Sequence, residues 1–206
     1  MTRPLLITDC DEVLLHMVGH FADWLGDAHD IDFAIEGGDF ANALTRRHDG
    51  RTVAKEEVWP LLNGFFRGEM HRQTLVPGAK EALAAIGQRA DIVVLTNILD
   101  EHREGRAAQL RAFGIDHRVM CNQGGKGTPV KALIAEYMPS VAVFVDDLPV
   151  HHASVAKDAP DVWRLHMISE PRLADAIPPA PAAQARIDDW SEAREWIEAR
   201  FDGVPL

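Results

Sequence analysis

Four short apolar runs in the sequence each end in polar or turn-forming residues, and stretches with helical patterning separate them. The runs span Leu5 to Asp9, Ile92 to Thr96, Val141 to Val145 and Val162 to His166. The helical stretches span Ala79 to Ile86, Glu101 to Phe113, Pro129 to Met138 and Val150 to Ala156. Apolar runs of this length predict buried parallel strands. Their alternation with helices predicts an α/β fold with a doubly wound, Rossmann-like parallel sheet, in which ligands bind beyond the carboxyl ends of the strands.

The alternation stops between residue 14 and about residue 76, where apolar residues recur at helical spacing instead. A Pro-Gly pair then breaks the helical pattern and returns the chain to the core. An insertion of about sixty residues has the normal size of a small lid or subdomain. We therefore expect a small helical cap at residues 14–76 and an α/β core domain formed by residues 1–13 and 77–206.

The charge and composition of the chain restrict the ligands and the compartment that we expect. The sequence has 206 residues, with 32 acidic against 21 basic side chains and a net charge of -11. This charge repels nucleic acid and anionic membrane surfaces, so a phosphate-bearing substrate needs local positive charge or a metal. No apolar run approaches the roughly 20 residues that span a bilayer, and a low number of cysteines suits a reducing compartment. We expect a cytoplasmic protein that binds neither nucleic acid nor a membrane, and the oligomeric state stays open.

Two carboxylates, Asp9 and Asp11, follow the first predicted strand. Residues at i and i+2 lie on the same side of an extended chain, and a turn there can also set them around one point. Burying both negative charges is costly unless a cation compensates them. Acidic residues also end strands at ordinary solvated turns, so the pair alone leaves both interpretations open.

Polar residues also follow the second and third predicted strands. Thr96 and Asn97 close the second strand, where a hydroxyl and an amide can donate hydrogen bonds to phosphoryl oxygens without adding charge. Asp146 and Asp147 follow the third strand, and a set of oxygen ligands suits magnesium. The ordinary alternatives are turn contacts for Thr96 and Asn97 and a helix cap for Asp147.

A glycine-rich loop that contains one lysine precedes the helical stretch at Pro129. Thr128 is the expected N-cap, and Pro129 is the expected first helical residue. Lys126 in this loop would lie close to helix amides and can face a phosphate or a carboxylate cluster. A solvated loop lysine is the ordinary alternative, and Lys131, one turn later, is the competing candidate.

Several other polar residues have ordinary structural explanations. The adjacent His151 and His152 diverge by about 100° on a helix, so we expect a surface or core-edge role for them rather than a shared metal. The run from Arg46 to His48, and Arg67, could recognise a remote anionic group of a substrate. They could equally be solvated helix positions.

The four motifs occur in order, each at or near the end of an expected strand of one parallel sheet. This arrangement resembles the haloacid dehalogenase superfamily, whose motifs are an aspartate pair after the first strand, a Ser or Thr after the second, a lysine, and acids after a later strand. The resemblance covers residues 3–15 and residues 77 to about 166. The family commonly carries a cap between its first two motifs, which is where residues 14–76 lie.

The resemblance implies a role for each motif residue. Asp9 would be the nucleophile, and Asp11 would be the general acid and base. Thr96 and the backbone of Asn97 would bind the phosphoryl group, and Lys126 would neutralise charge on it and on Asp9. The presence of Asp11 argues against the founding dehalogenase activity, which resembles this chemistry at carbon but needs neither a metal nor an acid at that place.

The resemblance also implies a magnesium ion. Asp9, the backbone oxygen of Asp11, and Asp147 would hold it, with Asp146 as a direct or water-mediated ligand. Many members of the family place another acid four residues after Asp147, where this sequence has His151. We expect Asp146 to compensate for that difference.

The function implied by the resemblance is that of a magnesium-dependent phosphatase, which hydrolyses a small-molecule phosphate monoester through an aspartyl-phosphate intermediate. A phosphotransferase or phosphomutase of the same superfamily would share every core residue, so the sequence does not separate these activities. A non-catalytic phosphate- or protein-binding module with the same fold is a further alternative. The sequence does not identify the substrate.

Overall fold

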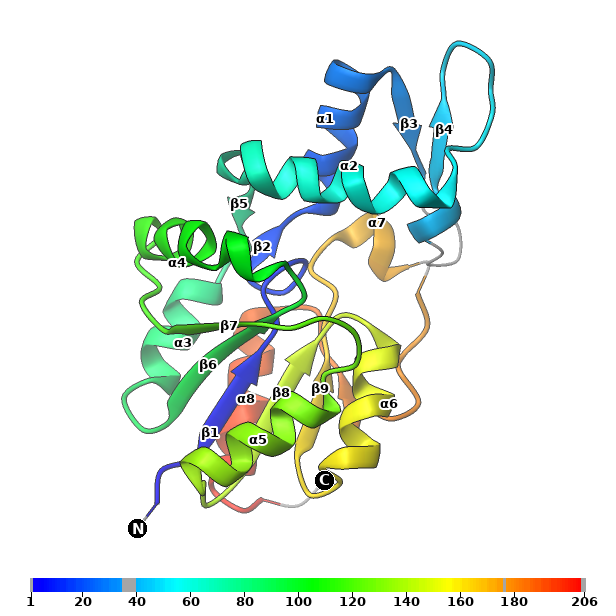
Figure 1. Ribbon diagram of the computed structural model, residues 1–206. Helices are drawn as coiled ribbons and strands as arrows, with labels where there is room; N and C mark the ends of the chain where they lie inside the picture. The colour runs from blue at the N-terminus through cyan, green and yellow to red at the C-terminus, as the bar shows by residue number, and fades with distance from the viewer. Residues whose placement is uncertain (1, 35–39, 176, 205–206) are drawn as a thin grey trace.

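The computed structural model describes residues 2–34, 40–175 and 177–204, and its centre is a six-stranded sheet (Figure 1). The strand order is β10-β9-β8-β1-β6-β7, and all neighbouring strands are parallel. The strands are β1 (Leu5–Thr8), β6 (Asp91–Thr96), β7 (Arg118–Cys121), β8 (Ala142–Asp146), β9 (Trp163–His166) and β10 (Ala185–Arg186).

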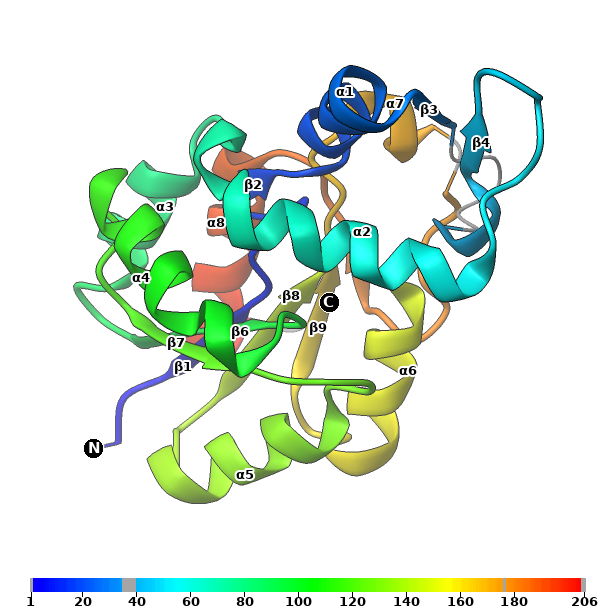
Figure 2. The same ribbon diagram turned by 45° about the horizontal axis from the view of Figure 1, so that its top comes forward.

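Helices cover both faces of this sheet, which makes it doubly wound (Figures 1 and 2). They are α3 (Ala79–Ile86), α4 (Arg103–Ala112, after the short turn η3, Asp100–His102), α5 (Gly127–Tyr137), α6 (Pro149–Asp158) and α8 (Trp190–Phe201). In β1, Leu6 packs with residues of α3 and α8, whereas Leu5 and Ile7 pack with residues of α5 and α6. A strand buried on both faces is a continuous apolar run, which is why the sequence pattern identified it. The predicted fold class is confirmed.

The order of the strands creates a crevice at the carboxyl end of β1. From β1 the chain reaches β6 and β7 on one side of the sheet, and β8, β9 and β10 on the other. The direction in which strands are added to the sheet thus reverses at β1. Such a reversal separates the loops that follow the central strands and leaves room for a ligand. Thr8 pairs with both Val94 and Val145, so the three central strands end at nearly the same level. The polar residues that follow β1, β6 and β8 therefore converge.

Two local features differ from the sequence predictions. Helix α5 begins at Gly127, so Lys126 occupies the N-cap and Thr128, the expected cap, lies inside the helix. Strand β7 was not predicted. It is an edge strand with one exposed and three half-buried residues. It therefore lacks the continuous apolar run of a central strand.

Residues 14–76 form elements outside the central sheet. These are β2 (Leu15–His16), α1 (Val18–His29), β3 (Ile31–Phe33), η1 (Phe40–Asn42), β4 (Leu44–Arg46), α2 (Lys55–Gly68), η2 (Met70–Arg72) and β5 (Thr74–Leu75). In the described part of this segment, β2 pairs with β5 and β3 pairs with β4, and no strand joins the central sheet. The segment thus contains strands as well as the predicted helices. The division of the chain into a cap and a core domain stays a prediction.

A second hydrophobic cluster joins α1 and α2 to a distant part of the chain. Phe21 and Phe65 meet edge to face in it, with ring centroids 5.5 Å apart. Ile168 and Leu173 pack into the same cluster, and Figures 1 and 2 draw α7 (Pro171–Ala174) among the elements formed by residues 14–76. The hydrophobic packing therefore crosses the predicted boundary of the cap.

Among the described residues, no helix combines the length and the apolar character needed to cross a bilayer.

Candidate active site

The turn after β1 places two carboxylates at different positions in the crevice. Asp9 still belongs to the sheet, because its backbone N–H donates to Val145 O of β8 at 2.8 Å. The chain then turns sharply, with Glu12 in the left-handed region at φ 60°. Asp11 therefore lies beyond the end of the strand, whereas Asp9 is still hydrogen-bonded to β8.

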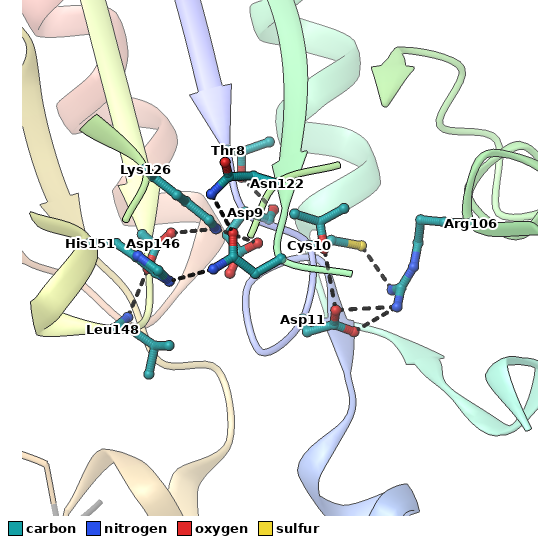
Figure 3. Close-up of polar contacts among 12 residues, drawn as sticks. Thr8, Asp9, Cys10, Asp11, Arg106, Asn122, Lys126, Asp146, Leu148 and His151 are labelled. Atoms are coloured by element: carbon teal, nitrogen blue, oxygen red, sulfur yellow. Dashed lines mark hydrogen bonds and ion pairs between the residues drawn. The ribbon is translucent and has the colours of Figure 1, made fainter. Parts of the chain in front are cut away.

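Lys126 lies between two of the acids at the carboxyl end of the sheet (Figure 3). Its Nζ is 2.7 Å from Asp9 Oδ1 and 2.7 Å from Asp146 Oδ2, and its side chain is fully buried. Burial disfavours the charged ammonium, but Asp146 and Asp9 outweigh burial and raise the pKa of Lys126 above its usual value. The competing candidate, Lys131, is exposed on α5. The structure thus brings Lys126, and not Lys131, to the predicted nucleophile.

Three carboxylates at the carboxyl end of the sheet are arranged as potential metal ligands. Asp9, Asp146 and Asp147 each offer an oxygen within 4.8 Å of the others. Burial raises the pKa of Asp9 and of Asp147, and the neighbouring carboxylates add to this effect. Burial acts on Asp146 too, but Lys126 lowers the pKa of Asp146 below its usual value. A cation would offset the remaining repulsion, and a set of oxygen donors fits a hard divalent ion such as magnesium.

Asp11 faces away from Lys126, toward a buried arginine (Figure 3). Arg106 Nη2 is 3.0 Å from Asp11 Oδ1 and donates to Oδ2 at 3.2 Å, and Gln73 Nε2 donates to Oδ1 at 2.7 Å. The guanidinium is fully buried and also donates to Cys10 Sγ at 3.0 Å. Burial disfavours its charge, but Asp11 and Cys10 outweigh burial and raise the pKa of Arg106. Arg106 and Gln73 therefore fix the direction of the Asp11 carboxylate.

Arg106 and Gln73 were not among the candidate site residues predicted from the sequence. In α4, both Arg106 and Leu110 are buried. Their spacing of four residues was a usable signal, because it places the arginine on the apolar face of the helix. Gln73 had no such signal, since it lies just before the short strand β5 and its contact with Asp11 spans 62 residues of sequence.

Thr96 and Asn97 lie at the carboxyl end of β6, beside the acids. Thr96 is buried, and its hydroxyl is 3.5 Å from Asp11 Oδ2. The side chain of Asn97 is exposed and holds a neighbouring loop: Nδ2 donates to Gly124 O at 2.9 Å, and Oδ1 accepts from Asn122 Nδ2 at 2.9 Å. Both residues thus share one end of the sheet with the two aspartates of the first motif.

Histidines support the acidic end of β8 from the protein interior. His152 Nε2 donates to Asp146 O at 2.9 Å, and His166 Nε2 donates to Asp147 O at 2.8 Å, since a carbonyl oxygen can only accept. Burial lowers the pKa of His152 to about 4, which keeps its ring neutral at pH 7. His151 is buried as well. Of the two roles considered for His151 and His152, the surface role is wrong and the core-edge role fits, because α6 packs against β8 and β9 and both side chains are buried.

A cavity of about 690 Å³ lies over these residues. We call its acidic side the floor, where Asp9, Asp11 and Asp147 line the cavity, Asp146 is buried at the end of β8 and Lys126 is buried at the start of α5. We call the facing apolar wall the roof. The roof consists of Met17, Val18, Phe40, Trp59, Leu62, Phe66, Leu173 and Ile177.

Glu12 connects the floor to helix α1. Its Oε1 accepts from the backbone N–H groups of Met17 at 2.7 Å and Val18 at 2.6 Å, where α1 begins. Its carbonyl oxygen accepts from the N–H and the hydroxyl of Ser169 at 3.0 and 2.7 Å. Burial raises the pKa of Glu12 to about 7. The turn that carries Asp11 is therefore hydrogen-bonded to the start of α1 and to Ser169, which lies two residues before α7.

No protein-family model matches the sequence, and no curated protein matches it. Solved structures do match almost the whole chain. A proposed haloacid dehalogenase hydrolase from Bacillus subtilis, solved with magnesium bound, has a TM-score of 0.65 at 12% identity and covers 96% of this chain and 99% of its own. A proposed phosphoglycolate phosphatase from Lactobacillus plantarum has a TM-score of 0.64 at 14% identity, and the match covers 95% of this chain and 99% of that protein. A proposed β-phosphoglucomutase from Thermotoga maritima has a TM-score of 0.60 at 14% identity, and the match covers 95% of this chain and 98% of that protein. Likeness at this level of identity shows a shared fold.

Proposed function

We propose that this chain, which has the fold of the haloacid dehalogenase-like hydrolases, is a magnesium-dependent phosphatase that acts on a small-molecule phosphate monoester. One observation carries the proposal: Lys126 Nζ lies 2.7 Å from Asp9 Oδ1, and Asp146 and Asp147 adjoin them at the floor of a cavity. A carboxylate can attack an anionic phosphoryl group only where positive charge offsets their repulsion. The floor places a buried ammonium at the attacking group and gathers three carboxylates closely enough to hold a metal.

In the proposed reaction, an oxygen of Asp9 bonds to phosphorus while the bond from phosphorus to the ester oxygen breaks. Asp11 gives a proton to the leaving oxygen, and then takes one from the water that attacks the aspartyl-phosphate. Inorganic phosphate leaves, and the Asp9 carboxylate is regenerated. Thr96 and the backbone of Asn97 bind the phosphoryl oxygens, and Lys126 stabilises their charge.

Asp9, Asp147 and the backbone oxygen of Asp11 would hold the magnesium ion, with Asp146 as a direct or water-mediated ligand. The oxygen donors of the floor fit such an ion. When bound, it would offset the repulsion between the attacking carboxylate and the phosphoryl group. Residues 14–76 would act as a cap that covers the floor and excludes water.

Phosphoryl transfer to a second hydroxyl is the alternative function, and the likeness to a proposed β-phosphoglucomutase favours it. The floor would work in the same way until Asp9 carries the phosphoryl group. Only the acceptor differs, because a hydroxyl of a bound molecule would replace the attacking water.

A panel of phosphate esters tests the proposal. We expect release of inorganic phosphate by the purified protein with magnesium, little release in excess chelator, and none by an Asp9→Asn variant. Conversion of an ester without release of phosphate would identify a phosphotransferase or phosphomutase. No conversion of any ester, by a protein that still binds phosphate, would contradict both activities and indicate a binding module.

A further inference from the structure

The roof of the cavity is an aromatic and aliphatic surface. Phe40 and Trp59 stack there, with ring centroids 6.1 Å apart and planes inclined by 8°. Trp59 keeps 55% of its surface exposed although it is the largest apolar side chain of α2. On the opposite rim, Leu148 and Val150 are 40% and 63% exposed and also line the cavity. Apolar surface left open at a cavity on both sides is typical of a binding site for an apolar group.

The three arginines that were considered for anion recognition are paired with acids. Arg46 Nη2 lies 2.6 Å from Glu57, and Arg67 Nη2 lies 3.0 Å from Glu101. Arg47 Nε lies 2.6 Å from Asp32. Among the described side chains that line the cavity, none is a lysine or an arginine.

An anionic group on the distal end of a substrate would therefore be unfavourable in this cavity. It would lose its hydration against apolar side chains, and no described lining cation would compensate that loss. The acids of the floor would add repulsion. The polar lining groups away from the floor include the amides of Asn63 and Gln123, which can bond a neutral hydroxyl or carbonyl.

We infer that the site takes a phosphate monoester of an apolar, uncharged alcohol, and that it discriminates against esters with a second anionic group. This inference rests on the proposed function. The cavity, at about 690 Å³, lies within the usual range of roughly 300–1,000 Å³ for small-molecule sites and accommodates a six-carbon or aromatic leaving group. The floor binds the phosphoryl group, and the roof selects the alcohol.

A matched pair of esters tests the inference. Hexyl phosphate and 6-phosphooxyhexanoate differ only in the terminal methyl or carboxylate, and both leave as primary alcohols of similar reactivity. We expect kcat/KM for hexyl phosphate to exceed that for the carboxylate by roughly 100-fold, and to rise about fourfold per methylene from ethyl to hexyl phosphate. Equal values, or a preference for the carboxylate, would overturn the inference and leave the phosphatase proposal intact.

Binding measurements keep the inference testable if no ester is hydrolysed. Calorimetry with magnesium would compare hexylphosphonate with 6-phosphonohexanoate, which contain no ester bond to hydrolyse. Tighter binding of hexylphosphonate, by roughly tenfold or more, supports the apolar roof even if the phosphatase proposal fails. Equal binding of the two phosphonates contradicts it.

A charge placed in the roof gives an independent test. Trp59→Arg should reduce the preference for hexyl phosphate over the carboxylate ester by roughly tenfold or more, because the guanidinium can pair with the distal carboxylate. Gly68→Arg is the matched control, since it adds the same charge to α2 at an exposed position outside the cavity. An unchanged preference in Trp59→Arg, or an equal shift in Gly68→Arg, would contradict the inference.

Discussion

The floor and the roof of the cavity are built in different ways. The floor is a set of buried charges at the ends of parallel strands, where Lys126 contacts Asp9 and Asp146, and Arg106 contacts Asp11. The roof is apolar, and its residues belong to α1, η1, α2 and α7 or lie within three residues of α1 and α7. Buried ion pairs fix direction and charge, whereas apolar packing tolerates changes of shape. Under the proposed function, the floor would determine the reaction and the roof would determine which molecule undergoes it.

Replacing the nucleophile should give the largest effect. Asp9→Asn should lower kcat by roughly 10⁴-fold or more for every ester, because an amide is nearly isosteric with the carboxylate but is a poor nucleophile. Phosphate-release assays would measure the loss, and circular dichroism would verify the fold. Near-normal turnover by Asp9→Asn would mean that another group attacks phosphorus, and the contrast between floor and roof would disappear.

Removal of the metal should have the next largest effect. Excess chelator should lower turnover by roughly 10³-fold, since a metal supplies several kcal/mol of charge stabilisation, and added magnesium should restore it. Manganese or cobalt should partly replace magnesium, because oxygen ligands discriminate weakly among such ions. Magnesium should also raise the unfolding temperature, as it offsets the repulsion among Asp9, Asp146 and Asp147. Full turnover in chelator would contradict the proposed role of the acids.

Loss of the proton-transfer group should depend on the leaving group. Asp11→Asn should lower turnover of p-nitrophenyl phosphate by about 10²-fold, the low end of the range for general acid–base catalysis, because that leaving group needs little protonation. The loss for an alkyl phosphate should be larger. Mass spectrometry should detect a phosphate adduct on Asp9, since its hydrolysis slows. Equal losses for the two esters, without an adduct, would argue against this role of Asp11.

The contact that orients Asp11 should have a smaller effect. Arg106→Lys keeps the charge but cannot reproduce the paired contact with the carboxylate, so kcat should fall roughly tenfold while KM changes little. Arg103→Lys, at an exposed position of the same helix, is the control. Steady-state kinetics on an alkyl phosphate would measure both. A rise in KM alone would indicate that Arg106 acts on substrate binding and not on the direction of Asp11.

A change in the roof should have the smallest effect and should depend on the substrate. Leu62→Ala removes apolar surface from the cavity, so kcat/KM for hexyl phosphate should fall roughly fivefold and that for ethyl phosphate by less than about twofold. The control is Leu61→Ala on the same helix, where the side chain packs into the second hydrophobic cluster and does not line the cavity. Equal losses for both esters would mean that the roof does not select the alcohol.

The central fold could be predicted from the sequence because the signals are local. β1, β6 and β8 are buried on both faces, so each is an uninterrupted apolar run, and helix α3 spans the predicted residues. Strand β7 escaped prediction because an edge strand has a weaker apolar pattern. The strands within residues 14–76 are only two or three residues long, which is too short for a periodic signal.

The sequence by itself determined which acids follow which strands, because strand ends and the residues beside them are neighbours in the chain. The tertiary structure decided which partners these acids have. Arg106 and Gln73 reach Asp11 across 95 and 62 residues. Both His151 and His152 are buried by the packing of α6 on the sheet, and Leu173 joins a cluster formed mostly by residues 14–76. Periodicity describes residues a few positions apart, whereas burial and ion pairing depend on segments that only folding brings together.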